Sequence, residues 1–358
     1  MIARLPRLVL ATLLAALLPA PPADGQSAAP PTPSASRTVT ILLNSGLSGA
    51  NSWLLLAESR GYFRAEGLEV RFTTGTAPYM TAERMEPESF DFGYGDINAL
   101  IEQAAIHPET APVGVFMVFN RSPSAIVLPR ASPITTPAQL VGKRIIGHAS
   151  DVALNTFDAY AARARIDPSK VMIVRDSSDW PTLMTRLREG RADAVFGDIS
   201  TSMAVVEAAG GDAEGTLRFL RYSDAAPELY GSALMASRAM VRSEPGVVRA
   251  FVRAANRGLV ATVSDPDAAI AELVRRTPEL RPEVERNRLL RTLHGDMGSP
   301  EGKKLGIGDV EPKRLSQAIQ LMRETSRLPR LPRADEVFSR AFLPPLSDRI
   351  TTLAHERR

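Results

Sequence analysis

The stretch FDFGYGDINALIEQAAI, residues 90–106, decides the fold, because a short apolar strand runs directly into an apolar helix. Residues 90–94 are typical of a buried strand, and a helix is expected from about residue 96 to residue 106. The aspartate between them suits a helix start, where its side chain accepts hydrogen bonds from free backbone N–H groups. Such strand-to-helix units are the repeating elements of α/β folds.

Similar units lie on both sides of this stretch. Before it come a β-branched run at residues 38–43, a helix candidate at 51–62 and a period-two strand pattern at 68–72. After it, residues 113–119 and 125–128 are typical of buried strands. Alternation of this kind predicts a mostly parallel sheet with helices on both faces.

A second set of units begins at TPAQ, residues 136–139, which fits a capping box with proline at the first helical position. Strands are expected at residues 143–147, 171–174, 192–196 and 217–222, and helices at 152–164, 179–188 and 200–208. After one more strand at 232–236 the pattern is almost entirely helical, starting with an apolar stripe between residues 247 and 259. The sequence therefore predicts two α/β regions and a helical C-terminal region.

Composition narrows the class of protein. The 358 residues, 44% hydrophobic and 23% charged, suffice for two domains. The 43 basic and 40 acidic residues are interleaved, so we expect no nucleic-acid binding. Cysteine is absent, which excludes disulfides and cysteine ligands for iron–sulfur clusters or structural zinc.

The N-terminus has the pattern of a secretory signal peptide. Arg4 and Arg7 precede the uncharged run LVLATLLAALL at residues 8–18, and a Pro-, Ala- and Ser-rich segment follows. The run is shorter than the roughly 20 residues of a membrane span, although an uncleaved anchor is the alternative. We expect residues 1–28 to be a cleaved signal peptide and flexible lead-in, and no cysteine is present to carry a lipid anchor. The expected location is the periplasm.

Five motifs carry a family resemblance. They are LLAESRGYFRAEGLEVRF at residues 55–72, FDFGYGD at 90–96, TPAQLVGKRIIG at 136–147, GRADAVF at 190–196 and SEPGVVRAFVRAA at 243–255. In this order the chain resembles the sulfonate, nitrate, taurine and thiamine-precursor family of periplasmic substrate-binding proteins of ABC importers. The resemblance extends over about residues 38–259.

This resemblance implies a type II periplasmic-binding-protein fold. Such a fold has two α/β lobes with mixed sheets, joined by a two-strand hinge, and here a helical C-terminal extension. Lobe one would comprise residues 37–122 plus 230–345, and lobe two residues 123–229. Crossovers near residues 120–125 and 224–230 would form the hinge, and the lobes would close around a ligand.

Ligand contacts are expected where strands lead into helices, because free N–H groups gather at the carboxyl ends of the strands. The candidate ligand-binding residues are Asn44, Ser45, Asn51, Trp53, Tyr94, Asp96, Ser150, Asp151, Asp198 and Tyr230. Several of them have a structural alternative. Trp53 either stacks on a flat ligand or packs in the core, and Asp96 and Asp198 either bind ligand or only cap helices.

The ligand class follows from charge. Sulfonate and nitrate binders of the family need positive charge at the site. Of the four candidate strand-to-helix junctions, which begin at residues 44, 93, 148 and 197, three contain aspartate. This favours a neutral or basic heterocycle, such as a thiamine-precursor pyrimidine. Arg121, near the first crossover, would reverse that inference if it paired with a carboxylate. A sulfonate or aromatic-acid binder and a non-transport sensor remain as alternatives.

An enzymatic role is disfavoured. Relatives in this family include pyrimidine-synthesising proteins that use a cysteine-rich motif and a histidine, and this chain has no cysteine. The four histidines show no HExxH spacing, and neither a G-x-S-x-G elbow nor a phosphate-binding P-loop occurs. We expect no catalytic residue, no metal site and no cofactor. The expected partners are a small-molecule ligand and an inner-membrane ABC permease, with the protein itself a monomer.

Overall fold

The computed structural model describes residues 36–353. The expected signal peptide at residues 1–28 lies outside the described residues. Within residues 36–353, none of the helices has the length and apolar character needed to cross a bilayer.

The first lobe is built on a mixed five-stranded sheet in the order β2-β1-β3-β10-β4. Its strands are β1 (Arg37–Leu42), β2 (Leu68–Thr73), β3 (Phe92–Asp96), β4 (Val113–Met117) and β10 (Ser232–Ala236). β1 runs parallel to β2 and β3, whereas β10 is antiparallel to β3 and β4. β10 differs because the chain returns through it from the second lobe.

The second lobe repeats this plan with the order β7-β6-β8-β5-β9. Its strands are β5 (Ser124–Pro129), β6 (Arg144–His148), β7 (Met172–Asp176), β8 (Ala194–Asp198) and β9 (Leu217–Arg221). β6 is parallel to β7 and β8, and β5 is antiparallel to β8 and β9. Again the antiparallel strand in the fourth position has just arrived from the other lobe.

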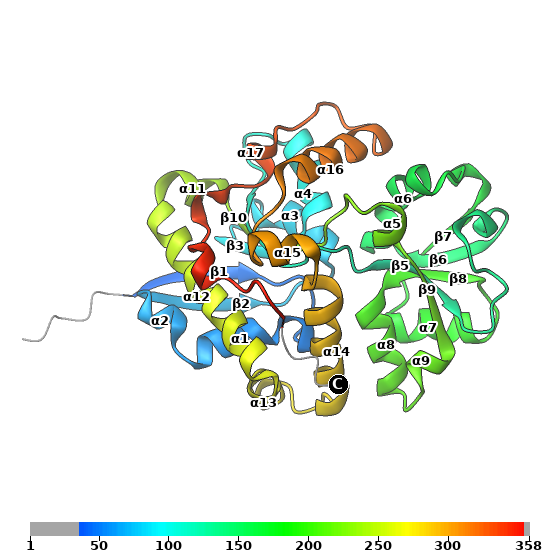
Figure 1. Cartoon of the computed structure of the whole chain (residues 1–358), viewed down its shortest axis with the longest axis horizontal. Helices are drawn as coiled ribbons and strands as arrows, with labels where there is room; N and C mark the ends of the chain where they lie inside the picture. The colour runs from blue at the N-terminus through cyan, green and yellow to red at the C-terminus, as the bar shows by residue number, and fades with distance from the viewer. Residues whose placement is uncertain (1–35, 354–358) are drawn as a thin grey trace, which may run out of the picture. The chain divides into compact units, whose positions relative to one another are not determined.

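Helices follow most strands, as the apolar patterns predict. Lobe one contains α1 (Ser52–Ser59), α2 (Tyr62–Ala65), α3 (Thr81–Met85) and α4 (Ile97–Ile106). Lobe two, drawn mainly in green in Figure 1, contains α5 (Val152–Asn155), α6 (Phe157–Ala164), α7 (Trp180–Arg188), α8 (Ile199–Ala208), α9 (Ala213–Thr216) and α10 (Tyr222–Ala225). The single helix expected at residues 152–164 is two helices, because Thr156 leaves helical geometry at φ −101°, ψ 11°.

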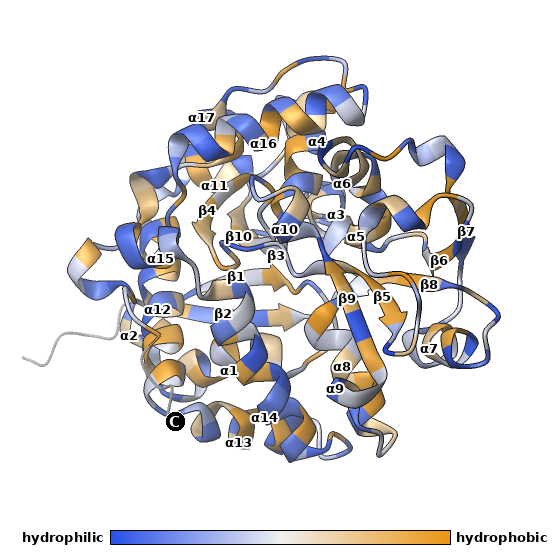
Figure 2. Ribbon diagram, turned by 45° about the vertical axis from the view of Figure 1, so that its right-hand side comes forward, coloured by the Kyte–Doolittle hydropathy of each residue, from blue (hydrophilic) through white to orange (hydrophobic). Residues whose placement is uncertain are grey.

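The C-terminal extension is helical, as expected. It comprises α11 (Arg238–Ser243), α12 (Pro245–Ser264), α13 (Pro266–Arg276), α14 (Pro282–Arg291), a π-helix (Thr292–Met297), α15 (Pro300–Leu305), α16 (Pro312–Thr325) and α17 (Ala334–Val337). Prolines open most of these helices, because the first helical residue needs no N–H donor. α12 packs on α1, and its Phe251 ring stacks on Phe92 of β3 with centroids 3.9 Å apart. Figure 2 shows strands β4 and β5 mainly in orange, while α14 carries both colours.

Two segments cross between the lobes, and they pair with each other through backbone hydrogen bonds. The backbone N–H groups of Val118 and Phe119 donate to the Ser232 carbonyl at 3.0 and 2.9 Å. Gly231 N–H in turn donates to the Phe119 carbonyl at 3.0 Å. This pairing forms the two-strand hinge of the fold.

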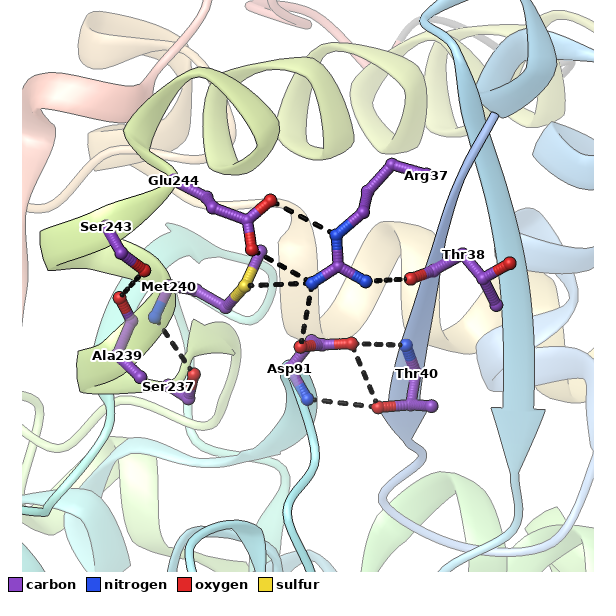
Figure 3. Close-up of polar contacts among 9 residues, drawn as sticks. All are labelled: Arg37, Thr38, Thr40, Asp91, Ser237, Ala239, Met240, Ser243 and Glu244. Atoms are coloured by element: carbon purple, nitrogen blue, oxygen red, sulfur yellow. Dashed lines mark hydrogen bonds and ion pairs between the residues drawn. The ribbon is translucent and has the colours of Figure 1, made fainter. Parts of the chain in front are cut away.

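An ion-pair cluster fixes the start of β1 (Figure 3). Arg37 donates through Nε and Nη2 to the two carboxylate oxygens of Glu244, at 3.1 and 2.9 Å. The same guanidinium lies 3.8 Å from Asp91, whose other oxygen accepts from Thr40 N–H at 2.9 Å. The cluster therefore ties the first strand to the start of β3 and to the junction of α11 and α12.

Candidate functional site

One cavity of about 430 Å³ lies between elements of both lobes. Loops that follow β1, β3, β6 and β8 all contribute to its wall, and so does the C-terminal extension. Six of the candidate residues line it: Asn44, Ser45, Asp96, Ser150, Asp151 and Asp198. The four strand-to-helix junctions, two from each lobe, thus open into one space, which we call the cleft.

The other four candidates lie behind the cleft wall. The Trp53 and Tyr94 side chains are fully buried and meet edge to face, with ring centroids 5.9 Å apart. Asn51 closes the loop after β1 by accepting from Ser48 N–H at 3.0 Å. Buried Tyr230 donates to Glu301 at 2.8 Å. In this structure these four side chains support the cleft and do not line it.

Four aspartates of the cleft are helix caps. Asp96, Asp151, Asp179 and Asp198 accept hydrogen bonds from N–H groups of the first turns of α4, α5, α7 and α8. An N-cap aspartate satisfies donors that have no partner inside the helix. The sequence therefore places aspartates at these positions for folding reasons, whether or not they also touch a ligand.

Burial shifts the pKa of the two aspartates that cap α4 and α5. Burial raises the pKa of Asp96 to about 7, against hydrogen bonds from Ala99 and Asn98 that favour the charged form. Burial also raises the pKa of Asp151 to about 7, with a smaller contribution from the charge of Asp198. Both carboxyl groups are therefore partly protonated near neutral pH.

The second tryptophan of the chain lines the cleft. Trp180 begins α7, is partly exposed, and lies against Gly197 immediately before Asp198. Phe119 from the first crossover adds a second aromatic side chain to the wall. The sequence pointed to Trp53 as the tryptophan that could contact a ligand. Trp180 was expected only as part of the helix at residues 179–188 of lobe two. Its position just after the cap Asp179 is the signal that could have identified it.

The C-terminal extension supplies three more lining residues that the sequence analysis missed. Arg288, Thr292 and Asp296 follow one another along α14 and the π-helix at intervals of four residues. This spacing puts them on one helix face. The repeat was visible in the sequence, but nothing there indicated that an extension helix faces a cleft built from distant loops.

α14 touches both lobes. Buried Glu285 accepts from Gly49 N–H of lobe one at 2.6 Å. Toward lobe two, Arg288 donates to Thr201 at 2.8 Å, and Arg291 forms a two-point ion pair with Glu207 at 2.7 and 2.9 Å. The helix thus spans one side of the cleft and couples the loop after β1 to α8.

The described residues offer little support for a nucleophilic or a metal-binding site. His148 Nδ1 lies 2.7 Å from Ser150 Oγ at the cleft wall. The two residues share one loop, and an interaction between near neighbours is typical of local turn structure. Within residues 36–353, no three His, Cys, Asp or Glu side chains are placed to hold a metal ion.

Comparisons with known proteins place this architecture in a family. The family model described as "NMT1/THI5 like" matches residues 51–269. A curated relative, the 4-amino-5-hydroxymethyl-2-methylpyrimidine phosphate synthase of Legionella pneumophila, is 25% identical over an alignment of 265 positions that covers 71% of this chain and 78% of the relative.

Among solved structures, the fold is similar to the periplasmic aliphatic sulphonate-binding protein SsuA of Escherichia coli, with a TM-score of 0.65, 17% identity, and coverage of 84% of this chain and 91% of that one. The alkanesulfonate-binding protein SsuA of Xanthomonas axonopodis pv. citri, bound to MOPS, also matches with a TM-score of 0.65, at 18% identity, over 86% of this chain and 100% of that one. These likenesses concern the fold. Because the family model covers more than half of its length, the chain belongs to the NMT1/THI5-like family and has the type II periplasmic-binding-protein fold.

Proposed function

We propose that the protein is the periplasmic solute-binding component of an ABC importer. It would capture one small molecule in the cleft by hinge closure and deliver it to an inner-membrane permease. The observation that carries this proposal is a single cavity of about 430 Å³ whose wall is shared by both lobes and the extension. Pockets of about 300–1,000 Å³ are typical of sites for small organic molecules.

The cleft chemistry favours a polar or heterocyclic ligand, such as a thiamine-precursor-type pyrimidine. Helix N-termini and their aspartate caps offer both donors and acceptors at the wall. Trp180 and Phe119 offer flat apolar surface for a ring. A sulfonate or aromatic acid is a poorer match, because Arg288 is the one Lys or Arg among the described lining residues.

Catalysis is the second candidate, because a relative at 25% identity is named as a pyrimidine phosphate synthase. The family resemblance implies that pyrimidine-synthesising relatives use a cysteine-rich motif and a histidine, and the 358-residue sequence has no cysteine. We therefore propose binding without turnover. A sensor that docks on a receptor would use the same cleft, and neighbouring genes for a permease and an ATPase would favour transport.

Thermal-shift screening of purified protein with pyrimidines, amines, sulfonates and aromatic acids tests this function. A ligand at 100 times its Kd should stabilise the protein by about 2.7 kcal/mol. Product analysis of the same mixtures by mass spectrometry should show the ligand unchanged. If no class shifts the melting temperature, or if the ligand is converted to a product, the binding role is wrong.

A further inference from the structure

Asp296 differs from every other carboxyl group of the cleft. Five aspartates and one arginine line this cavity, within the part of the chain that the structure describes. Four of the aspartates cap helices. Asp296 instead lies near the C-terminal end of the π-helix, and its side chain forms no hydrogen bond or ion pair with any residue among 36–353. Folding therefore does not explain why a carboxyl group is there.

The position is unfavourable for an isolated carboxylate. Asp296 is 5% exposed, and burial disfavours its charged form. The C-terminal end of a helix carries partial negative charge, which repels a carboxylate. Burial raises the pKa of Asp296 well above its usual range, and the nearby charge of Asp198 raises it further. A binding partner with positive charge would relieve all three effects.

The groups that face Asp296 have unused hydrogen-bonding capacity for such a partner. Asp198 of lobe two uses one carboxylate oxygen to cap α8, accepting from Thr201 N–H at 2.7 Å, and its other oxygen has no hydrogen bond to residues 36–353. The Thr292 hydroxyl, one helical turn before Asp296, is buried without a partner among the same residues. Burial and the charges of Asp296 and Asp198 raise the pKa of Tyr94 behind them, so its phenol stays neutral.

No Lys or Arg side chain among residues 36–353 forms an ion pair or hydrogen bond with the Asp296 carboxyl group. Arg288 lines the cleft and donates to the Thr201 hydroxyl at 2.8 Å, while its Nε has no partner among residues 36–353. The charges of Arg221 and Arg121 lower the pKa of Asp296 less than burial and Asp198 raise it. Neither guanidinium forms an ion pair with Asp296 within residues 36–353; both act on it only through their charge.

We propose that the ligand carries a positively charged nitrogen, held between Asp198 of lobe two and Asp296 of the extension, beside the Trp180 ring. Trp180 supports this because an indole face attracts a cation more strongly than other aromatic rings do. The cation would bridge lobe two and the extension, so it would favour the closed cleft. This inference rests on the proposed solute-binding function and names the charge class of its ligand.

A matched series of planar probes tests the charge directly. Benzamidinium, benzamide and benzoate are close in shape and carry a positive charge, no charge and a negative charge. Titration calorimetry of the full protein should find benzamidinium bound at least about tenfold more tightly than benzamide, because hydrogen bonds to charged groups are the stronger ones. Equal affinity for all three, tighter binding of benzoate, or no binding of any would overturn the inference.

Variants identify the residues responsible. Asp296→Asn and Asp198→Asn keep the side-chain shape and should each weaken benzamidinium by about tenfold, with benzamide little changed. Asp212→Asn is the matched control, because it removes an equal charge from the cap of α9 in lobe two, outside the cleft. A loss in Asp212→Asn as large as that in Asp296→Asn would mean that only overall charge matters, and would refute the site.

The outcome is separable from that of the proposed function. If thermal-shift screening finds an anionic ligand in the cleft, the protein is still a binding protein and only the charge inference fails. If no ligand of any kind binds, both fail together. Circular dichroism of each variant confirms that it is folded before its affinity is compared.

Discussion

Two corners of the molecule are built alike. In lobe one β3 ends at Asp96 and turns into α4, and in lobe two β8 ends at Asp198 and turns into α8. Each aspartate faces a serine across an antiparallel strand pair, Ser232 and Ser124 respectively. In each corner the first helical N–H donates to a crossover carbonyl, at 3.0 Å from Ile97 to Gly231 and at 3.1 Å from Ile199 to Pro123.

Their surroundings differ. Asp96 is 2% exposed and accepts from Asn98 N–H, Ala99 N–H and the Asn98 amide. Asp198 is partly exposed and accepts one hydrogen bond, from Thr201. Lobe one therefore uses its aspartate fully for folding, while lobe two leaves carboxylate capacity facing the cleft. The same local motif can serve stability in one lobe and recognition in the other, depending on what packs behind it.

The largest expected effect distinguishes the two tryptophans. Trp53 lies behind the lobe-one corner, and Trp180 lies beside the lobe-two corner at the cleft wall. Trp53→Ala should lower the free energy of unfolding by about 3–5 kcal/mol, because it empties a fully buried site against Tyr94. Trp180→Ala should change stability little and weaken a cationic ligand by about 0.5–2 kcal/mol. Urea denaturation and titration calorimetry measure the two effects. Wild-type stability in Trp53→Ala, or wild-type affinity in Trp180→Ala, would contradict the assignment.

Much of the fold could be predicted from the sequence, because strand and helix patterns are local. The FDFGYGD and GRADAVF segments each predict a strand that leads to an aspartate, and both aspartates line the cleft. What lies behind each strand depends on distant contacts. The burial of Trp53 and the partial exposure of Trp180 could not be told apart, since both lie in the first turn of a helix.

The contribution of the extension to the cleft could not be predicted from the sequence, again because it depends on contacts between distant segments. Asp296 lies about 100 residues from Asp198 in sequence, and no local pattern relates them. Its neighbourhood, HGDMGSP, has the composition of a loop, whereas the structure places it in a π-helix. π-helical segments occur often at functional sites, but their presence follows from tertiary packing.

The pH dependence of stability should reveal the buried aspartate of the lobe-one corner. The folded-state pKa of Asp96 is about 7, above the value of about 3.9 expected in the unfolded chain. Between these values the folded state binds more protons, so stability falls as pH rises from about 4 to about 7. Asp96→Asn removes this titration and keeps a cap, so it should be more stable than wild type at pH 8, by at most about 4 kcal/mol.

Denaturation curves at pH 4.5, 6 and 8 provide the measurement for Asp96→Asn. Asp151 has the same shift, so part of the slope should persist in this variant and disappear further in the double variant with Asp151→Asn. A pH slope identical to that of the wild type would show that Asp96 does not titrate in this range.

The third prediction concerns the glycine before each aspartate. A Cβ on Gly95 would lie 2.4 Å from the Thr81 Cβ and 2.9 Å from the Pro78 carbonyl oxygen. Gly95→Ala should therefore cost about 1–3 kcal/mol of stability through overpacking. A Cβ on Gly197 would lie 2.3 Å from the outer edge of the Trp180 ring, which borders the cleft. Gly197→Ala should therefore mainly reduce ligand affinity, and comparable melting temperatures for both variants would contradict the distinction.

The smallest expected effect concerns α14, which contacts α8 after the lobe-two corner. Arg291 and Glu207 are each about one-fifth exposed, so their ion pair is partly screened by solvent. Glu207→Gln should change the free energy of closure by no more than about 1 kcal/mol. If the pair forms only in the closed protein, ligand affinity falls up to about fivefold, and the difference from wild type shrinks at high salt. If it also persists in the open protein, stability falls while Kd is unchanged, so measuring both quantities decides whether α14 moves with lobe one or with lobe two.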